Sequence, residues 1–330
     1  MVAPRKTAVV AVGGNALIGA GEHGTVAEES GHARVIAAAI ERMIADGWSI
    51  AVTHGNGPQV GIILRRSDVT AGVDPDLPPL PLHYCVAETQ GGIGFLLVSA
   101  LANELRARGL PDRVVAVLTQ TVVSLDDPAF ANPSKPIGSF YGREEAENYR
   151  AERGWTIVED SGRGYRRVVP SPTPLRIVES AAVARLLGEG FTVVTVGGGG
   201  VPVVAQPDGE LRGVDAVIDK DHASALLAAD LGADLLVLCT SVDQVALNYG
   251  TPTQRFLDRM STDEAEQHLE AGQFPAGSMG PKIEAALRFL RSGGAEVLIT
   301  SIDRLGDALD GRTGTRLTAR RNPATLGNRR

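Results

Sequence analysis

Residues 192–206 read TVVTVGGGGVPVVAQ, a run of β-branched residues that is interrupted by four successive glycines, Gly197 to Gly200. The β-branched side chains favour a strand, and the glycines end it. Each glycine in an ordered segment costs roughly 0.5–1 kcal/mol relative to alanine, because a more flexible backbone is ordered on folding. A single glycine is enough for a turn, so four in a row indicate an additional requirement on this backbone.

The same pattern, a short apolar strand followed by glycines or small polar residues and then a helix, recurs along the chain. It occurs at 8–14, 49–57, 191–200, 234–243 and 295–303, with a further strand at 113–119. Unbroken apolar runs indicate strands that are covered on both faces, as in a parallel sheet. Helices with an apolar stripe are expected at 30–46, 89–108, 177–188, 222–231 and 281–291. The alternation predicts an α/β fold, a three-layer αβα sandwich around a mostly parallel central sheet.

The overall composition favours a folded protein with an aliphatic core. Hydrophobic residues make up 43% of the 330 residues and aromatic residues 4%, so the core must consist mainly of Val, Leu, Ile and Ala. The formal net charge is −7, from 32 basic and 39 acidic residues. This acidic balance argues against nucleic acid as the main partner.

The cysteines and the apolar segments bear on the location of the protein. Cys85 and Cys239 form no disulfide framework and no CxxC metal knuckle, which fits a reducing compartment. No stretch approaches 18 uninterrupted apolar residues, and the first apolar run ends at Gly13-Gly14. We therefore expect a cytoplasmic protein without a membrane span or a signal peptide.

Residues 126–176 depart from the alternation of strands and helices. They contain a proline-flanked lysine, a charged helical stretch and two strand-like arms around Ser161-Gly162-Arg163-Gly164, which is a hairpin signal. We expect a small, lid-like subdomain there, protruding from a single domain that spans 1–317. The residues 318–330 hold four arginines and no acid, and we expect a flexible basic tail.

Two other predicted strands end in glycine-rich turns, Gly13-Gly14-Asn15 and Gly55-Asn56-Gly57. The carboxyl ends of parallel strands meet at one edge of a sheet, where such folds bind their ligands. Backbone N–H groups converge on an anion where side chains are absent, and the amino terminus of a following helix adds partial positive charge. One such turn alone is explained more simply as a tight connection. Three of them, one with Gly197–Gly200, predict a polyphosphate site.

The common phosphate-binding motifs do not account for these turns. The Walker pattern GxxxxGK[ST] is absent. A GxGxxG match at Gly19–Gly24 begins well past the first strand instead of directly after it. We interpret this match as a surface loop, because the dinucleotide fingerprint places its glycines in the strand-to-helix turn itself.

Three lysines occur in settings that are unusual for a surface side chain. Lys135 lies between two prolines that fix the backbone. Lys220 follows Asp219, a natural helix N-cap, and Lys282 follows a proline at the start of another helix. A lysine at a helix start opposes the helix dipole, and a bound anion would remove this conflict. Solvated surface lysines are the alternative, and the pattern favours a function for Lys220 and Lys282 while it leaves Lys135 open.

Together these segments resemble a carbamate kinase of the amino acid kinase family. The matching segments are AVGGNAL (11–17), THGNGPQVG (53–61), ANPSKPIGSFYG (131–142), RRVVPSP (166–172), VGGGGVPV (196–203), VIDKD (217–221), VDQVALNYGTP (242–252) and GSMGPKIEAA (277–286). They follow one another in the family order over residues 8–317. This ordered set is more specific than any single glycine motif.

The resemblance implies reversible phosphoryl transfer between ATP and carbamate, with ADP and carbamoyl phosphate as the other pair and Mg²⁺ as a cofactor. It also implies an eight-stranded, mostly parallel sheet with a protruding subdomain, and a homodimer. The residues expected on the carbamate and the transferred phosphoryl group are Gly13, Gly14, Asn15, Gly55, Asn56 and Gly57. Those expected on ATP are Gly197, Gly198, Gly199, Gly200, Val245, Tyr249, Pro252 and Met279. The catalytic set implied is Lys135, Lys220, Lys282 and Asp219, with Asp219 orienting a lysine.

The chemistry of this reaction agrees with such a set of residues. Phosphoryl transfer spreads charge over the equatorial oxygens, so positioning and cationic stabilisation supply most of the catalysis. An attacking carbamate oxygen is already anionic and needs no general base, so His54 is expected to stabilise its turn. The other histidines show no metal-ligand spacing, and we expect no metal held by protein side chains.

Three alternatives stay open from the sequence. The chain could be a kinase of the same fold that acts on another small acid, such as an acylated amino acid or a phosphonate. It could be a nucleotide-binding sensor that no longer catalyses, which the three lysines disfavour. A Rossmann oxidoreductase is the third, and it rests on the Gly19–Gly24 match and an acid further along.

Overall fold

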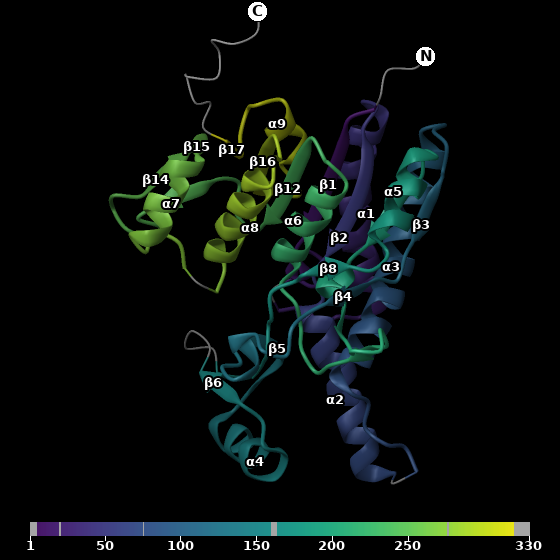
Figure 1. Cartoon of the computed structure of the whole chain (residues 1–330), viewed down its shortest axis with the longest axis vertical. Coiled ribbons are helices and arrows are strands. Elements are labelled where there is room, and N and C mark those ends of the chain that lie inside the picture. The colour runs from purple at the N-terminus through teal and green to yellow at the C-terminus, as the bar shows by residue number, and fades with distance from the viewer. Residues whose placement is uncertain (1–4, 20, 75, 160–163, 276, 320–330) are drawn as a thin grey trace, which may run out of the picture.

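A computed structural model describes residues 5–19, 21–74, 76–159, 164–275 and 277–319 of the chain (Figure 1). Its central feature is an eight-stranded sheet in the order β15-β17-β16-β12-β1-β2-β9-β3. The strands are β1 (Thr7–Val12), β2 (Ser49–His54), β3 (Val114–Ala116), β9 (Thr192–Thr195), β12 (Leu235–Thr240), β15 (Arg259–Ser261), β16 (Glu296–Ser301) and β17 (Thr315–Thr318). All neighbours from β16 to β3 pair in parallel, and β17 is antiparallel to β16. The predicted mostly parallel sheet is confirmed.

The apolar runs found in the sequence all form strands of this sheet, and each strand ends before the glycines or polar residues that follow it. β1 ends at Val12, directly before Gly13. Its last residue pairs with His54 of β2, and Thr53 of β2 pairs with Thr195 of β9. The carboxyl ends of β1, β2 and β9 therefore lie side by side, and the three glycine turns leave the sheet at one edge.

Helices cover both faces of the sheet and give the predicted three-layer sandwich (Figure 1). One layer consists of α1 (Val26–Ala45), α3 (Leu82–Ala107) and α9 (Leu305–Leu309), and the other of α5 (Ser180–Gly188), α6 (Lys220–Asp230) and α8 (Met279–Arg291). β1 shows why its sequence is apolar without alternation. Val10 and Val12 pack into the first layer, whereas Val9 and Ala11 pack into the second.

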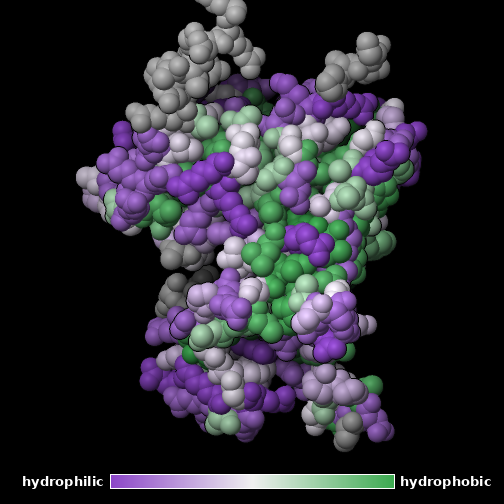
Figure 2. All heavy atoms as spheres, viewed as in Figure 1, coloured by the Kyte–Doolittle hydropathy of each residue, from purple (hydrophilic) through white to green (hydrophobic). Residues whose placement is uncertain are grey.

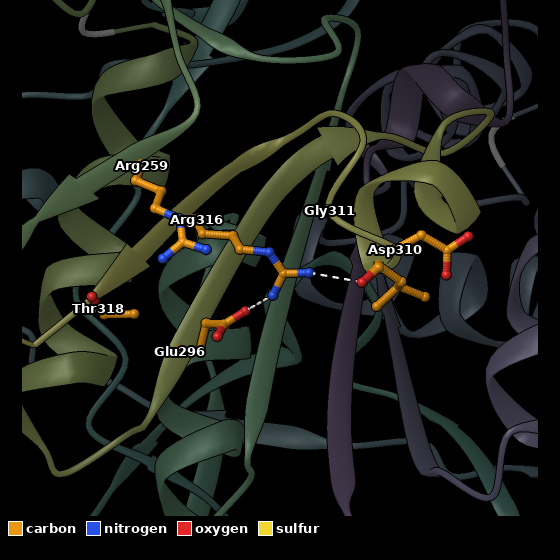
Figure 3. A pocket seen from close by; sticks show the side chains of 7 residues that line it. Arg259, Glu296, Asp310, Gly311, Arg316 and Thr318 are labelled. Carbon is orange, nitrogen blue, oxygen red and sulfur yellow. Dashed lines mark hydrogen bonds and ion pairs between the residues drawn. The ribbon is translucent and has the colours of Figure 1, made fainter.

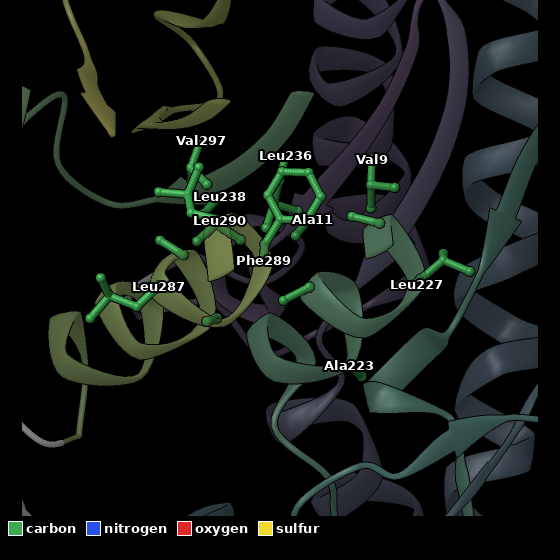
Figure 4. Close-up of a cluster of buried hydrophobic side chains, with 14 of the residues drawn as sticks. Val9, Ala11, Ala223, Leu227, Leu236, Leu238, Leu287, Phe289, Leu290 and Val297 are labelled. Carbon is green, nitrogen blue, oxygen red and sulfur yellow. The ribbon is translucent and has the colours of Figure 1, made fainter. Parts of the chain in front are cut away.

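Figure 4 shows the second layer from close by. Phe289 on α8 and Leu227 on α6 lie in the same buried cluster as Val9 and Leu236 of the sheet. Full burial of each such side chain stabilises the fold by roughly 1.5–3 kcal/mol. Close packing on both faces fixes the strands, and with them the strand ends that carry the glycine turns.

Several short elements are not predicted by the sequence pattern. A four-stranded sheet has the order β11-β10-β4-β8, and β13 pairs with β14 in a separate hairpin. These strands are β4 (Gln120–Val122), β8 (Arg176–Ile177), β10 (Val201–Ala205), β11 (Leu211–Gly213), β13 (Val245–Leu247) and β14 (Arg255–Leu257). The helices α2 (Gly57–Val73) and α7 (Thr262–Glu270) also lie outside the predicted set. Strands of two to five residues are too short to show a periodic signal.

A small unit protrudes from the body at the bottom of Figure 1, and we call residues 135–159 and 164–169 the protruding unit. It consists of β5 (Lys135–Tyr141), α4 (Arg143–Arg153), β6 (Ile157–Glu159) and β7 (Tyr165–Val169), with the strand order β5-β7-β6. Stacked Tyr149 and Trp155, 4.5 Å apart between ring centroids, form its separate small core with neighbouring apolar residues. The two predicted hairpin arms pair as antiparallel β6 and β7. Most of the predicted turn between them lies outside the described residues.

Two further expectations concern the ends of the fold. The predicted tail begins one residue too early, because Thr318 is the last residue of β17, and 320–330 lie outside the described residues. Among the described helices, α3 has the length and composition of a membrane-crossing helix. Half of that stretch is buried, however, and it packs on α1 inside the fold.

Candidate functional site

The three glycine turns are in direct contact with one another. A Cβ atom added to Gly55 would lie 2.7 Å from the backbone nitrogen of Gly14, so these two turns touch through their main chains. A Cβ atom added to Gly198 would lie 2.2 Å from Nδ2 of Asn56, so the third turn packs on the second. Asn15 lies in the short 3-10 turn Gly14–Ala16 that follows β1. The structure thus brings together the residues predicted to form the phosphate-binding edge.

Each of the four successive glycines has its own structural reason. A Cβ atom would meet His54 at 2.4 Å from Gly197, Asn56 at 2.2 Å from Gly198, Ile218 at 2.8 Å from Gly199 and Thr121 at 2.1 Å from Gly200. The last three also have positive φ angles of 63°, 86° and 89°, which side chains disfavour. The N–H groups of Gly199 and Gly200 donate to Val196 and Gly197 within the turn. Close packing therefore explains why all four residues are glycines, and the N–H groups of Gly199 and Gly200 form hydrogen bonds within the turn.

The residue before the glycines is strained. Val196 has a φ of 51°, a left-handed conformation that is a clear outlier for a β-branched residue. It is fully buried, and its N–H donates to Oγ1 of Thr119 at 2.9 Å. Such strain persists where the surroundings determine the backbone, and it is concentrated at functional sites.

Two consecutive residues of α3 hold two different turns in place. Oγ1 of Thr89 accepts a hydrogen bond from Nδ2 of Asn56 at 2.8 Å. The amide of Gln90 accepts from N and donates to O of Thr119, both at 2.9 Å, and Thr119 in turn holds Val196. Thr89 and Gln90 are not among the site residues that the sequence predicts. Their signal is a pair of amide and hydroxyl groups inside an apolar helix, which need partners when buried.

Two of the predicted lysines share one buried carboxylate. Nζ of Lys220 lies 2.5 Å from Oδ1 of Asp221, and Nζ of Lys282 lies 2.9 Å from Oδ2 of the same residue. The Asp221 side chain is 4% exposed, against 10% and 13% for the two lysines. Asp221 is not among the predicted site residues, although its position next to Lys220 at a helix start is a usable signal. Lys220 also reaches the turns, since its Cδ would lie 3.3 Å from a Cβ on Gly55.

Asp219 joins the protruding unit to the body. Its Oδ1 accepts from the backbone N–H of Asp221 at 2.9 Å, so it caps α6 as predicted. Its Oδ2 accepts from Nζ of Lys135, the first residue of β5, at 2.5 Å. Burial alone would raise the pKa of Asp219, but Lys135 outweighs this effect and holds the pKa well below its usual range.

The charges of the site favour an anion. Three lysines face two aspartates, which leaves one positive charge in excess at the amino terminus of α6. Burial lowers the pKa of Lys220, whereas Asp221 outweighs burial at Lys282 and raises its pKa. Burial would raise the pKa of Asp221, but the two lysines hold it below its usual value. Phosphate oxygens are the natural complement of such a cluster.

His54 supports the turns in a neutral state. It is fully buried, and its Nδ1 lies 3.1 Å from the carbonyl oxygen of Gly55, to which the protonated Nδ1 donates. Burial lowers its pKa to about 4, so the ring is uncharged near neutral pH. Its Nε2 faces Gly197, which places the ring between two glycine turns.

The residues predicted to bind the adenine and ribose are only partly gathered. Met279 opens α8 three residues before Lys282 and packs against the cluster that contains Val245. Val245 is fully buried, so a contact through its side chain would require this region to open. Tyr249 is 62% exposed in the loop after β13, and Pro252 is exposed nearby in sequence.

A surface hollow elsewhere has a different character. Figure 3 shows it at the amino end of β16, opposite the edge that carries the glycine turns. Arg316 there pairs with Glu296 and donates to the carbonyls of Ala308 and Leu309, so its charge is already compensated. In Figure 2 the visible face narrows between the body and the protruding unit, with apolar residues gathered across the middle.

This fold and this site define a class of protein, the α/β enzymes that transfer a phosphoryl group from a nucleotide. The chain belongs to the amino acid kinase family, whose model matches residues 6–301.

Individual relatives cover nearly the whole chain. The carbamate kinase of Thermococcus kodakarensis is 46% identical over 313 residues, which are 94% of this chain and 99% of that protein. The carbamate kinase-like protein YahI of Escherichia coli is 45% identical over 314 residues, 95% of this chain and 99% of that protein. The solved structure of the carbamate kinase from Giardia lamblia bound to citric acid is 40% identical, with a TM-score of 0.90. The same enzyme bound to AMP-PNP has a TM-score of 0.87, and both cover 96% of this chain and 99% of theirs.

Proposed function

We propose that this chain is a carbamate kinase, which transfers a phosphoryl group reversibly between ATP and carbamate and makes ATP from ADP and carbamoyl phosphate. The observation that carries the proposal is the pair Lys220 and Lys282 on Asp221, beside the contacting glycine turns. The carbamate kinases with about 45% identity over most of the chain support the choice of acceptor.

The residues of the site suit each part of this reaction. Lys220 and Lys282 bind the oxygens of the transferred phosphoryl group, where charge develops in the transition state. Asp221 holds both ammonium groups in place, so little reorganisation is needed when substrate binds. The turns at Gly14 and Gly55 bring main chain close to the carbamate side. No proton has to leave the anionic carbamate, which agrees with a neutral, buried His54.

The protruding unit contributes Lys135 to the same reaction. In the described conformation its Nζ is held by Asp219, with the Lys135 side chain 29% exposed. We propose that Lys135 turns from this carboxylate toward a phosphate oxygen when substrate is bound, and that the unit acts as a lid.

Mg²⁺ would arrive with the nucleotide. Both carboxylates of the site are occupied by lysines, Asp219 by Lys135 and Asp221 by the other two. The ion would therefore be held mainly by phosphate oxygens and water, as is usual for Mg²⁺ in kinases, and it would neutralise charge on the phosphates.

A kinase of the same fold with another small acid as acceptor is the second candidate. The observation that favours it is that a carbamate kinase-like protein is as similar to this chain as several carbamate kinases are. A nucleotide-binding sensor is a third candidate, and the complete set of three lysines stands against it.

A coupled assay for ATP formed from ADP and carbamoyl phosphate tests the proposal. We expect ATP formation with Mg²⁺ and none above the spontaneous breakdown of carbamoyl phosphate after chelation with EDTA. Lys220→Ala should reduce kcat roughly 100- to 1000-fold, the usual effect of removing one donor to developing charge. Lys6→Ala, at an exposed lysine, is the matched control. A wild-type chain that forms no ATP would point to another acceptor or to a sensor.

We also propose that the protein is a cytoplasmic homodimer. The exposed face of α3 carries Tyr84 and Phe95, which are 52% and 67% exposed, and the bare turn Gly91-Gly92 between them. It lies beside β3, the edge strand of the large sheet. A helix face with two exposed aromatic side chains and the exposed Glu88 between them, next to an open sheet edge, suits a second copy of the same surface. Two buried free cysteines agree with a reducing location.

A further inference from the structure

We propose that Gly61 on α2 is a positioning residue for Lys135, and that α2 sets the place of the protruding unit above the glycine turns. The inference rests on the proposed function of the site, in which Lys135 reaches a phosphate. α2 begins at Gly57, directly after the turn that contains Asn56. One helix is therefore continuous with the phosphate-binding edge at its start and touches the protruding unit along its side.

The contact at Gly61 is made by main chain alone. A Cβ atom added to Gly61 would lie 1.9 Å from Cα and 2.2 Å from N of Gly138 in β5. Carbon atoms in ordinary contact are about 3.5–4.0 Å apart, so alanine could not be accommodated without a shift of one element. The obstacle is backbone, which cannot rotate away as a side chain would.

Gly138 is also required by its own conformation. Its φ is +72°, and it lies in the irregular part of β5, between Ile137 and Tyr141, where the pairing with β7 shifts. Lys135 is three residues earlier on the same strand. The backbone that carries the lysine is thus turned at the point where it meets α2.

Neighbouring contacts hold this arrangement on the same face of α2. Leu64, three residues after Gly61, is buried in one cluster with Ile137 of β5. Asp68, two helical turns after Gly61, lies 3.5 Å from Nη1 of Arg153 on α4. The spacing i, i+3, i+7 places all three on one side of the helix. α2 therefore contacts the protruding unit through the main chain of Gly61, the apolar side chain of Leu64 and the carboxylate of Asp68.

A methyl group at Gly61 should therefore displace Lys135. Opening the contact from 1.9 Å to ordinary van der Waals distance requires a movement of roughly 1.5–2 Å. Three residues of extended chain, about 10 Å, connect Gly138 to Lys135. Residues 135–137 pair with β7 in one regular register, so we expect a displacement at Gly138 to reach Lys135. A movement of that size is comparable with the hydrogen-bond distance of 2.5 Å between Nζ of Lys135 and Oδ2 of Asp219, so it would break this contact.

The test compares Gly61→Ala with Gly72→Ala, a substitution on the same helix where a Cβ atom would meet nothing within 4 Å. Both changes raise helix propensity. We expect Gly72→Ala to keep the wild-type rate of ATP formation and Gly61→Ala to lose at least tenfold in kcat, with both proteins folded by circular dichroism. Equal rates in the two variants would overturn the proposal.

A double-mutant cycle shows whether the loss passes through Lys135. If Gly61 acts by positioning this lysine, Gly61→Ala should have little further effect on kcat in a Lys135→Ala background. Losses that multiply in the double variant would mean a general structural role and would overturn the positioning role.

Hydrogen exchange separates this inference from the proposed function, because it needs no substrate. Gly61→Ala should accelerate amide exchange in β5, over 135–141, at least tenfold more than Gly72→Ala does. If the wild-type chain makes no ATP but this difference is present, the proposed reaction fails and the role of Gly61 in placing Lys135 stands. If exchange in β5 is the same in both variants, the positioning role fails whatever the reaction.

Discussion

The chain contains four lysines among its 32 basic residues, and three of the four meet at the site. Arginine supplies the positive charge of the remaining surface almost entirely. The two side chains differ in chemistry, since lysine is a compact charge on a flexible stem and arginine a planar fork. Lys220 and Lys282 can place a point charge on each oxygen of Asp221 and still turn to a phosphate. The distribution indicates that lysine is used here for this property.

His54 gives a prediction at the scale of one residue. Its pKa is about 4 in the folded chain and near 6.5 when unfolded, so between these values the unfolded chain binds a proton that the folded chain does not. The free energy of unfolding should therefore fall as the pH is lowered from 6.5 to 4, by up to about 1.4 kcal/mol per pH unit from this group. Urea unfolding of His54→Gln across this range should show a correspondingly smaller slope than the wild type. The same change of slope in His23→Gln, at an exposed histidine, would contradict the assignment.

Individual residues were predictable where local sequence decides their role. Asp219 as a helix cap and Lys220 and Lys282 at helix starts follow from nearest neighbours in the sequence. Thr89 and Gln90 could not be found in this way, because their partners lie more than 25 residues away and are brought close by folding. The sequence also does not show why each glycine from Gly197 to Gly200 is required, because the residues that a side chain there would meet are distant in sequence.

At the scale of the element, α3 presents two different surfaces on opposite sides. Its buried side holds two glycine turns through Thr89 and Gln90, and its exposed side forms the proposed contact with a second copy. A single helix thus connects the proposed dimer surface to the glycine turns of the candidate site.

Substitution of Thr89 tests the buried side of α3. Thr89→Val keeps the shape but removes the acceptor of the Asn56 amide, and an unsatisfied buried donor costs about 1–3 kcal/mol. We expect at least a tenfold loss in kcat/KM in the coupled assay, and most of it restored in Thr89→Ser. Thr192→Val, a buried threonine at the amino end of β9, is the matched control. A loss in Thr89→Ser as large as in Thr89→Val would exclude the hydroxyl as the cause.

Long elements with a strong apolar pattern were predicted, and short ones were not. The six parallel strands of the large sheet and the helices α1, α3, α5, α6 and α8 follow from unbroken runs and helical stripes. β4, β10 and β13 have at most five residues each, and their pairing partners decide that they are strands. The sequence does not predict α2, because Gly61 and Gly72 lower its helix propensity. Contact with the protruding unit accounts for Gly61.

At the scale of the whole molecule, the proposed dimer is testable through Phe95. Phe95→Glu removes an exposed aromatic side chain and adds a second carboxylate to the face of α3 that carries Glu88, without disturbing the core, since Phe95 is 67% exposed. Light scattering after size exclusion should change from twice the chain mass of 34.5 kDa to that mass itself. Val35→Glu, on the exposed side of α1, should leave the mass unchanged. A wild-type chain that already elutes as a monomer would contradict the dimer.

The order of strands in the large sheet has a consequence for how the protein is made. β1 leaves the ribosome first, yet one of its two neighbours is β12, with Ala8 paired to Leu235. Until Leu235 has been translated, that side of β1 has no strand to pair with, and Lys282, which follows later in the chain, cannot yet pair with Asp221. During this part of its synthesis the unpaired edge of β1 is available to strands of other chains, which favours aggregation. Chaperones would be most useful in that period.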